Sequence, residues 1–173
     1  MVLPFIFEYF DTSDEPRFPR AVLVTHVIYK GTQLGSIAGI ATGLASAIRK
    51  RTFAPIFKHC TNGAIFGTVV IAPLMLFMKY RTYEDVKDCE FDRAYRLKYH
   101  ETQNRCDKFS LVSSVAGAAI GATAYPPLGM AGGFCVGTAL GVGLHVATSF
   151  TFTPDGQRVS LKEQWKQSRQ KIG

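Results

Sequence analysis

Charged residues are distributed very unevenly along this chain. Three long segments, 31–48, 59–78 and 109–154, contain no Asp, Glu, Lys or Arg. A helix needs about 20 mostly apolar residues to cross the hydrocarbon core of a bilayer. The first two segments therefore fit one membrane span each, and the third is long enough for two spans joined by a turn. Consecutive prolines at Pro126 and Pro127 mark that turn, because proline cannot continue a helix.

This pattern predicts an all-α membrane protein in which four glycine-rich transmembrane helices form a compact bundle. The expected parts are an acidic, aromatic arm, a four-span domain and a polar tail, at residues 1–20, 21–152 and 153–173. The spans are expected at about 24–48, 59–78, 109–125 and 129–152, with a loop at 79–108. In a soluble protein of this size most helices would need a charged or polar face toward water, which the segment 109–154 does not supply.

The loop at 79–108 is rich in both basic and acidic side chains and carries a helical signal of its own. Thr82 and Asp85 have the spacing of a capping box, which predicts a helix from about Tyr83 to Tyr99. Its apolar side would consist of Val86, Cys89, Phe91, Ala94, Tyr95 and Tyr99. We expect this helix to lie along the membrane surface or against a partner. A fully solvated helix is the alternative.

The glycines of the predicted spans recur at intervals of four residues. Positions four apart lie on one face of a helix, and small residues let two helices approach closely in lipid, where burial alone does not drive association. Glycine costs about 1 kcal/mol relative to alanine inside a water-exposed helix, so these rows suit a bilayer better than water. We predict helix-packing positions at Gly31, Gly35, Gly39, Gly43, Gly63, Gly67, Gly117, Gly121, Gly129, Gly133, Gly137 and Gly141.

The net charge of +7 is not arranged for nucleic acid, because the basic residues do not form a surface interleaved with aromatic side chains. The connector at 49–58 holds four basic residues and no acid. By density, the positive-inside rule places this connector on the matrix or cytoplasmic side, although the rest of the chain holds more Lys and Arg in total. We predict that the connector contacts an anionic lipid such as cardiolipin through Arg49, Lys50, Arg51 and Lys58.

Residues that could carry chemistry are few. No phosphate loop, dinucleotide fingerprint or nucleophile elbow occurs in the sequence, so we expect no catalytic residue, cofactor site or metal site. Cys89 and Cys106 share the 79–108 loop, where a disulfide formed in an oxidising compartment would pin the two ends of the inserted helix and its return strand. Two free thiols are an equal alternative. Lys30 lies inside an apolar segment, and we interpret it as snorkelling to the interface, with a neighbouring protein as the alternative contact.

Three short motifs occur in the order of a known family. They are small-x-x-aromatic at Gly63-Ala64-Ile65-Phe66, Arg-x-x-x-Asp at Arg81-Thr82-Tyr83-Glu84-Asp85, and small-Gly-x-x-x-Gly at Ala116-Gly117-Ala118-Ala119-Ile120-Gly121. Through them the chain resembles the mitochondrial Tim-type family of preprotein and amino acid transporters over about residues 21–152. The gaps between the motifs are longer here than in that family, so the 79–108 loop is interpreted as an insertion.

The amino-terminal arm narrows the resemblance. The run from Phe7 to Asp14 resembles the start of the Tim-like accessory branch found in respiratory complex I, where an aromatic pair precedes an acid. This resemblance implies a multi-pass protein of the mitochondrial inner membrane, with both termini in the intermembrane space and other membrane-arm subunits as neighbours. It also implies no redox chemistry. The first expectation is therefore a non-catalytic accessory subunit of NADH:ubiquinone oxidoreductase that braces and assembles its membrane arm.

Two other functions stay open at the level of sequence. One is a channel or translocase component of the inner-membrane import machinery, and the other is an accessory subunit of a different respiratory complex or of ATP synthase. Transport sites in membranes usually use ionisable groups or broken helices. The second, third and fourth predicted spans contain no Asp, Glu, Lys or Arg, which favours the structural role.

Overall fold

The computed structural model of the chain describes residues 18–81, 86–98, 100–124 and 128–149. All regular secondary structure in these residues is helical, which confirms the predicted all-α class. The elements are α2 (Pro19–Lys50), α3 (Ala54–Phe66), η1 (Gly67–Ile71), α4 (Ala72–Arg81), α5 (Val86–Lys98), α6 (Glu101–Ala124) and α7 (Leu128–Ser149). The predicted tail, and the predicted arm up to residue 17, lie outside the described part.

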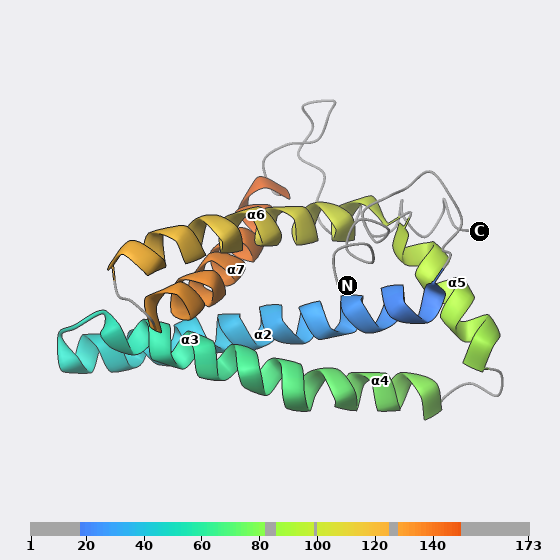
Figure 1. Ribbon diagram of the computed structural model, residues 1–173, viewed down its shortest axis with the longest axis horizontal. Helices are drawn as coiled ribbons and strands as arrows, with labels where there is room; N and C mark the ends of the chain where they lie inside the picture. Colours follow the sequence, from blue (N-terminus) through green and yellow to red (C-terminus); the bar gives the residue numbers. More distant parts are fainter. Residues whose placement is uncertain (1–17, 82–85, 99, 125–127, 150–173) are drawn as a thin grey trace.

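The elements form two helical hairpins and one short crossing helix (Figure 1). α3, η1 and α4 are one continuous helix, Ala54–Arg81, which runs back along α2 as the second half of the first hairpin. α6 and α7 form the second hairpin, and α7 packs against both α2 and α3. α5 crosses the end of the first hairpin where α2 begins and α4 ends.

Two of the described helices are long and apolar enough to cross a membrane, Ala54–Arg81 and Gly129–Ser149. They correspond to the second and fourth predicted spans. α2 begins at Pro19, before the start predicted at about residue 24, and α6 has a polar stretch before its uncharged part, so both helices are longer than the predicted spans. α6 already begins at Glu101, within the region predicted as a loop.

Pro73 is accommodated by a π-helical stretch, η1. Proline has no N–H to donate to the carbonyl four residues earlier. A π turn is wider than an α turn, and here the amide of Ala72 donates to the carbonyl of Gly67. The kink expected from this proline therefore takes the form of a widened turn, and the helix continues through it.

The turn between α2 and α3 is short and well defined. α2 ends where Arg51 adopts the left-handed conformation, with φ of 52°, and donates its N–H to the carbonyl of Ala47. α3 begins at Ala54 with Pro55 in its first turn, where proline fits because its missing N–H would have no partner. The predicted basic connector is thus divided among the end of α2, a tight turn and the start of α3.

The interior of the molecule is small and polar, whereas the exterior is large and apolar. Buried positions are mostly alanine, cysteine, glycine, serine and threonine, together with several charged side chains. Large apolar side chains face outward along every long helix, for example Leu44, Val69, Phe77, Ile120 and Leu144. A water-soluble protein seldom exposes so much contiguous apolar surface. This distribution is what a protein surrounded by an apolar medium would need.

Candidate functional site

A seam of glycines joins the two helices of the first hairpin. Gly31 lies opposite Gly67, and Gly35 lies opposite Gly63. A methyl group added at any of these four positions would come closer than 3.0 Å to a carbonyl oxygen of the facing glycine. The two backbones are therefore in direct contact, which only glycine permits.

The same seam continues toward the turn of the hairpin. A methyl group at Gly39 would lie 2.5 Å from Cα of Cys60, and one at Gly43 would lie 2.8 Å from Cα of Ile56. Both neighbours are backbone atoms, which cannot move aside as a flexible side chain could. The row of glycines on α2 thus lies against the backbone of α3 and η1 over more than three helical turns.

The second hairpin has a similar glycine seam, but its longer glycine row is on its second helix, α7. Gly117 and Gly121 of α6 lie opposite glycines at 133 and 129 of α7, and a methyl group at Gly141 would lie 2.5 Å from Cα of Ser110. A methyl group at Gly137 would meet the carbonyl of Ser113. The longer glycine row is on the first helix of the first hairpin, but on the second helix of the second hairpin.

All the glycines predicted as packing positions lie at these two seams, and two further glycines of the described residues do not. Gly132 of α7 faces the side chain of Phe57, with 2.6 Å between its added methyl group and Cβ of Phe57. This contact joins the two hairpins and was missed because Gly132 is outside the four-residue rows. Gly143 has open space around it, with nothing within 4 Å.

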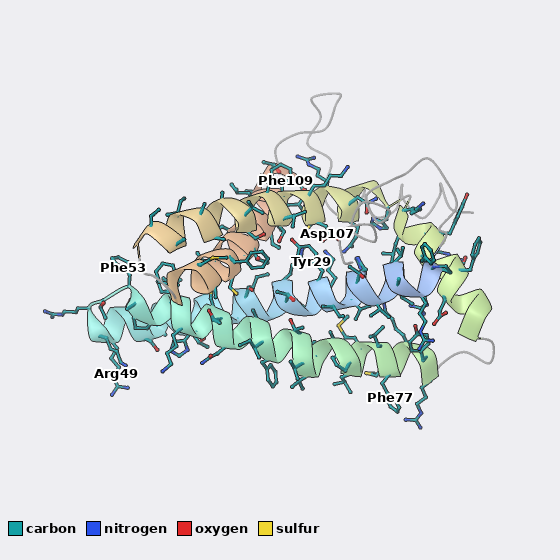
Figure 2. All side chains as sticks on the ribbon, viewed as in Figure 1. Tyr29, Arg49, Phe53, Phe77, Asp107 and Phe109 are labelled. Atoms are coloured by element: carbon teal, nitrogen blue, oxygen red, sulfur yellow. The ribbon has the colours of Figure 1, made fainter. Side chains whose placement is uncertain are left out.

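A buried cluster of polar side chains connects α2 to α6. The Lys30 ammonium donates to Oδ1 of Asp107 over 2.5 Å and to Oε1 of Gln33 over 2.8 Å. The Gln33 amide also donates to Oδ1 of Asp107, over 2.9 Å. The Asp107 carboxylate is fully buried, and Nδ1 of His26 lies 3.6 Å from its other oxygen. Figure 2 shows Asp107 with Tyr29 between the two helices.

This cluster corrects the interpretation of Lys30. The Lys30 side chain is only 16% exposed and pairs with Asp107 of the same chain. It therefore does not snorkel to the membrane interface, and its partner is not a neighbouring protein. Sequence reasoning missed Asp107 because it was counted with the loop. One signal could have found the pair. Lys30 directly precedes one uncharged segment, and Asp107 nearly adjoins another, so a bundle would bring these opposite charges to a similar depth.

Neutral polar side chains continue the interior beyond the cluster. Ser110 of α6 donates to the carbonyl of Thr138 on α7. Ser149 donates to the carbonyl of His145, one turn earlier. Each of these four side chains is buried. The Ser110 bond joins α6 to α7, whereas the Ser149 bond satisfies a buried hydroxyl within α7.

The four predicted lipid-binding residues are exposed at the tip of the first hairpin. Arg49 and Lys50 end α2, Arg51 forms the turn, and Lys58 stands in the second turn of α3. Figure 2 shows Arg49 pointing away from α6 and α7. Phe53, at the same tip, is 77% exposed. Basic and aromatic side chains together are typical of the interface between lipid headgroups and water.

α5 packs on the chain's own bundle with only part of the predicted apolar side. Ala94 is fully buried against Val22 of α2, and Leu97 packs on a cluster of α2 and α4 side chains. Phe91 and Tyr95 point outward and are 42% and 41% exposed. The remaining predicted apolar positions, Val86, Cys89 and Tyr99, have side chains outside the described part.

Polar contacts also fasten α5 to the first hairpin. The Tyr80 hydroxyl of α4 donates to Oε1 of Glu90 over 2.8 Å, and Nε of Arg20 lies 3.7 Å from the same oxygen. α5 therefore ties the beginning of α2 to the end of α4. This packing excludes the fully solvated alternative, whereas the predicted location along the membrane surface or against a partner stays a prediction.

Cys106 is a free thiol on α6 and is half-buried. Burial raises the pKa of this thiol above its ordinary value. A free Cys106 agrees with the free-thiol alternative rather than with a disulfide to Cys89, whose side chain lies outside the described part. Cys60 and Cys135 are free and buried between the hairpins. Among the described residues, no group of three His, Cys, Asp or Glu side chains is placed to hold a metal ion.

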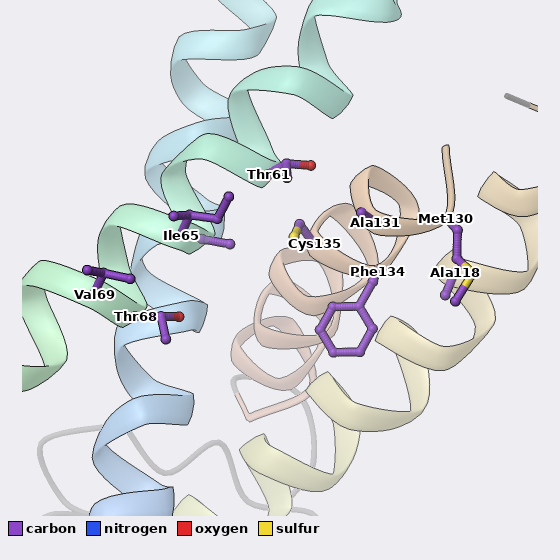
Figure 3. Close-up of a pocket in the computed structure, with 10 residues that line it drawn as sticks. Thr61, Ile65, Thr68, Val69, Ala118, Met130, Ala131, Phe134 and Cys135 are labelled. Atoms are coloured by element: carbon purple, nitrogen blue, oxygen red, sulfur yellow. The ribbon is translucent and has the colours of Figure 1, made fainter. Parts of the chain in front are cut away.

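An open apolar groove runs between the hairpins and encloses about 670 Å³ (Figure 3). One wall comes from α3 and η1, and the other from α6 and α7. The lining side chains are Thr61, Ala64, Ile65, Thr68, Val69, Ala118, Met130, Ala131, Phe134 and Cys135. No charged side chain lines the groove.

A known protein family matches most of this sequence. The family described as "Protein of unknown function (DUF1757)" matches residues 11–148. The chain belongs to this family. The match covers α2 to α6 and nearly all of α7, so both glycine seams and the Lys30–Asp107 pair lie within the family's extent. No curated protein matches the chain.

Proposed function

We propose that this chain is a four-span integral membrane protein whose spans are α2, Ala54–Arg81, the part of α6 from residue 109, and α7. The observation that carries this proposal is the distribution of side chains. Small and polar groups are buried, and large apolar groups face outward along all four helices. Lipid tails solvate such an exterior, and helix pairs in lipid associate through small residues as the two seams do.

The same distribution accounts for the charged residues of α2 and α6. A charge inside a bilayer is tolerated when it faces the bundle and finds a partner. Lys30 meets that condition, because it is directed inward and paired with Asp107, which lies just before the proposed third span. Their presence therefore does not argue against two further spans beside the two apolar ones.

The role that we propose is that of a non-catalytic accessory subunit of mitochondrial complex I, located in the inner membrane. The motif resemblance to the Tim-type family and the complex I-like start of the arm support this assignment. The seams support a bracing role, because helices in backbone contact cannot slide or separate without losing the contact. The basic tip would lie on the matrix side, and both termini would lie in the intermembrane space.

A translocase is the second candidate, and the open groove is the observation that favours it. A groove that admits a polypeptide would be expected to carry polar or ionisable groups. The groove between the hairpins is apolar, and the buried charges lie elsewhere, between α2 and α6. For this reason we place the accessory role first.

Complexome profiling tests the choice between these roles. Mitochondrial membranes are solubilised in mild detergent and separated on a native gel, and the peptides of this chain are followed slice by slice. Co-migration with NADH dehydrogenase activity near the top of the gel is expected. Migration with a smaller import assembly would overturn the accessory role in favour of the translocase, and migration with another respiratory complex would reassign it.

A further inference from the structure

The α3 and η1 wall of the groove lies on the same helix as an exposed lysine, Lys58. One face of the long helix carries Lys58, Ile65 and Val69. Ile65 follows Lys58 by seven residues and Val69 follows Ile65 by four, which are spacings that return to the same face. Ile65 and Val69 line the groove and are 56% and 65% exposed. Lys58 is exposed near the hairpin tip, about 16 Å from Val69 along the helix axis at 1.5 Å per residue.

The polar atoms of the groove are already satisfied within the chain. The Thr61 hydroxyl donates to the carbonyl of Phe57 over 2.9 Å. The Thr68 hydroxyl lies 2.8 Å from that of Thr32, which belongs to α2. The groove therefore presents mainly methyl and methylene groups to its occupant, and the thiol of Cys135, which also lines it, is only a weak hydrogen-bonding group. An occupant that fits is apolar along its length and carries its polar group only at one end.

We propose that this groove holds an acyl chain of an anionic phospholipid whose headgroup is bound by Lys58. The charge of the headgroup complements the ammonium group, and the remaining basic residues of the tip add to the positive potential at the same end. The long lysine stem can cover apolar surface while its charge reaches the headgroup layer. The proposal rests on the membrane embedding proposed above, and it holds whichever complex contains the chain.

The choice of an anionic lipid over a partner helix follows from the same contacts. A partner helix would gain only apolar contact in the groove, and nothing in the wall would select its position. A phospholipid uses both features at once, the apolar wall and the lysine at its end. Arg49 offers a matched comparison, because it has the same charge at the same tip but points away from α6 and α7.

The test uses the full chain purified in mild detergent and analysed by native mass spectrometry. Phosphatidylglycerol and phosphatidylcholine with identical acyl chains are titrated separately. The wild-type chain is expected to retain the anionic lipid about fivefold better, as one basic residue at a membrane surface supplies. Lys58→Gln should remove this preference, whereas Arg49→Gln should retain most of it. Equal retention of both lipids by the wild type, or equal loss in the two variants, would overturn the proposal.

A second variant tests the acyl chain separately from the headgroup. Ala131→Phe places a ring in the groove on the α7 side and leaves Lys58 unchanged. It should reduce retention of long-chain phosphatidylglycerol severalfold but leave a six-carbon analogue unaffected. Gly143→Phe, on the same helix but in open space, is the matched control. Unchanged long-chain retention in Ala131→Phe, or a second copy of the chain bound in the groove instead of lipid, would overturn the proposal.

The result is separable from that of the membrane assignment. Release of the wild-type chain from mitochondrial membranes by alkaline carbonate would contradict the four-span proposal itself. A chain that resists carbonate but shows no anionic preference in the titration would contradict only the lipid site. The two measurements therefore assign a failure to the correct proposal.

Discussion

Gly39 illustrates how little freedom a seam position has. Replacing it by alanine should gain about 1 kcal/mol of helix propensity, but the new methyl group would lie 2.5 Å from a backbone atom of Cys60. Overpacking of this kind costs about 1–3 kcal/mol, so the clash outweighs the gain. We expect Gly39→Ala to lower the unfolding temperature of the purified chain in detergent and to reduce its amount in the membrane.

Gly143→Ala is the control for this substitution. It adds the same methyl group in the same type of helix, where nothing lies within 4 Å. Its unfolding temperature should equal that of the wild type or exceed it slightly. If both variants behave alike, the seams do not contribute to stability as described.

Lys30 and Asp107 contribute to stability only as a pair. Removing one member leaves the other buried and unpaired, which costs about 3–5 kcal/mol, whereas replacing both by uncharged groups of similar size is often nearly neutral. We therefore expect Lys30→Met to destabilise strongly and the double variant Lys30→Met with Asp107→Asn to recover part of the loss. Unfolding of all four species in detergent gives the coupling free energy.

Arg96 provides the comparison for that cycle. It pairs with Asp92 on the exposed side of α5 over 3.0 Å, and exposed pairs of this spacing contribute roughly 0.3–0.5 kcal/mol. Arg96→Met should therefore have little effect. An equally small effect of Lys30→Met would mean that the buried cluster is not a structural connection between the hairpins.

The reactivity of Cys106 should depend on pH in a specific direction. Its raised pKa means that less thiolate exists at neutral pH than for an ordinary cysteine, and the thiolate is the reactive form. We expect slow alkylation near pH 7 and a rate that still rises with pH above the ordinary thiol pKa. Mass spectrometry without reductant should recover Cys106 alkylated. Recovery in a disulfide with Cys89 would contradict the free thiol.

At the scale of elements, α5 is distinguished by its anchor on the first hairpin. Ala94 is fully buried against Val22, whereas Tyr95, the next residue, is exposed. Ala94→Glu places an unpaired charge in that contact and should release α5, while Tyr95→Glu should be tolerated. Limited proteolysis should show faster cleavage between residues 79 and 108 only in Ala94→Glu. Equal cleavage in both variants would argue against the packed position of α5.

The elements also show what sequence patterns could and could not supply. The four-residue spacing of glycines predicted the faces that meet, because the spacing is a property of one helix at a time. The partner of Lys30 could not be read in the same way, since Asp107 comes from a helix 77 residues away. The inward face of α5 was predicted only in part, because Ala94 belonged to the predicted apolar side but so did Phe91 and Tyr95. Counting apolar residues did not reveal that the small Ala94 would be buried and the larger Phe91 and Tyr95 exposed.

At the scale of the whole molecule, the four spans proposed above would place both termini on one side of the membrane and the connector at 49–58 on the other. In mitoplasts, epitope tags at either end should be digested by added protease, whereas a tag inserted after Thr52 should be protected until detergent is added. Protection of only one terminus would exclude four spans.

The two glycine seams favour an order of folding in which each hairpin closes before the two hairpins dock. Glycine has no side-chain rotamers to lose, so closing either hairpin restricts very little side-chain motion, whereas docking the hairpins immobilises long side chains such as Lys30 and Gln33. Closing a hairpin also joins neighbours in the sequence, which loop-closure entropy favours. Each hairpin can therefore form before the two hairpins dock, and the contact between Lys30 and Asp107 completes the bundle.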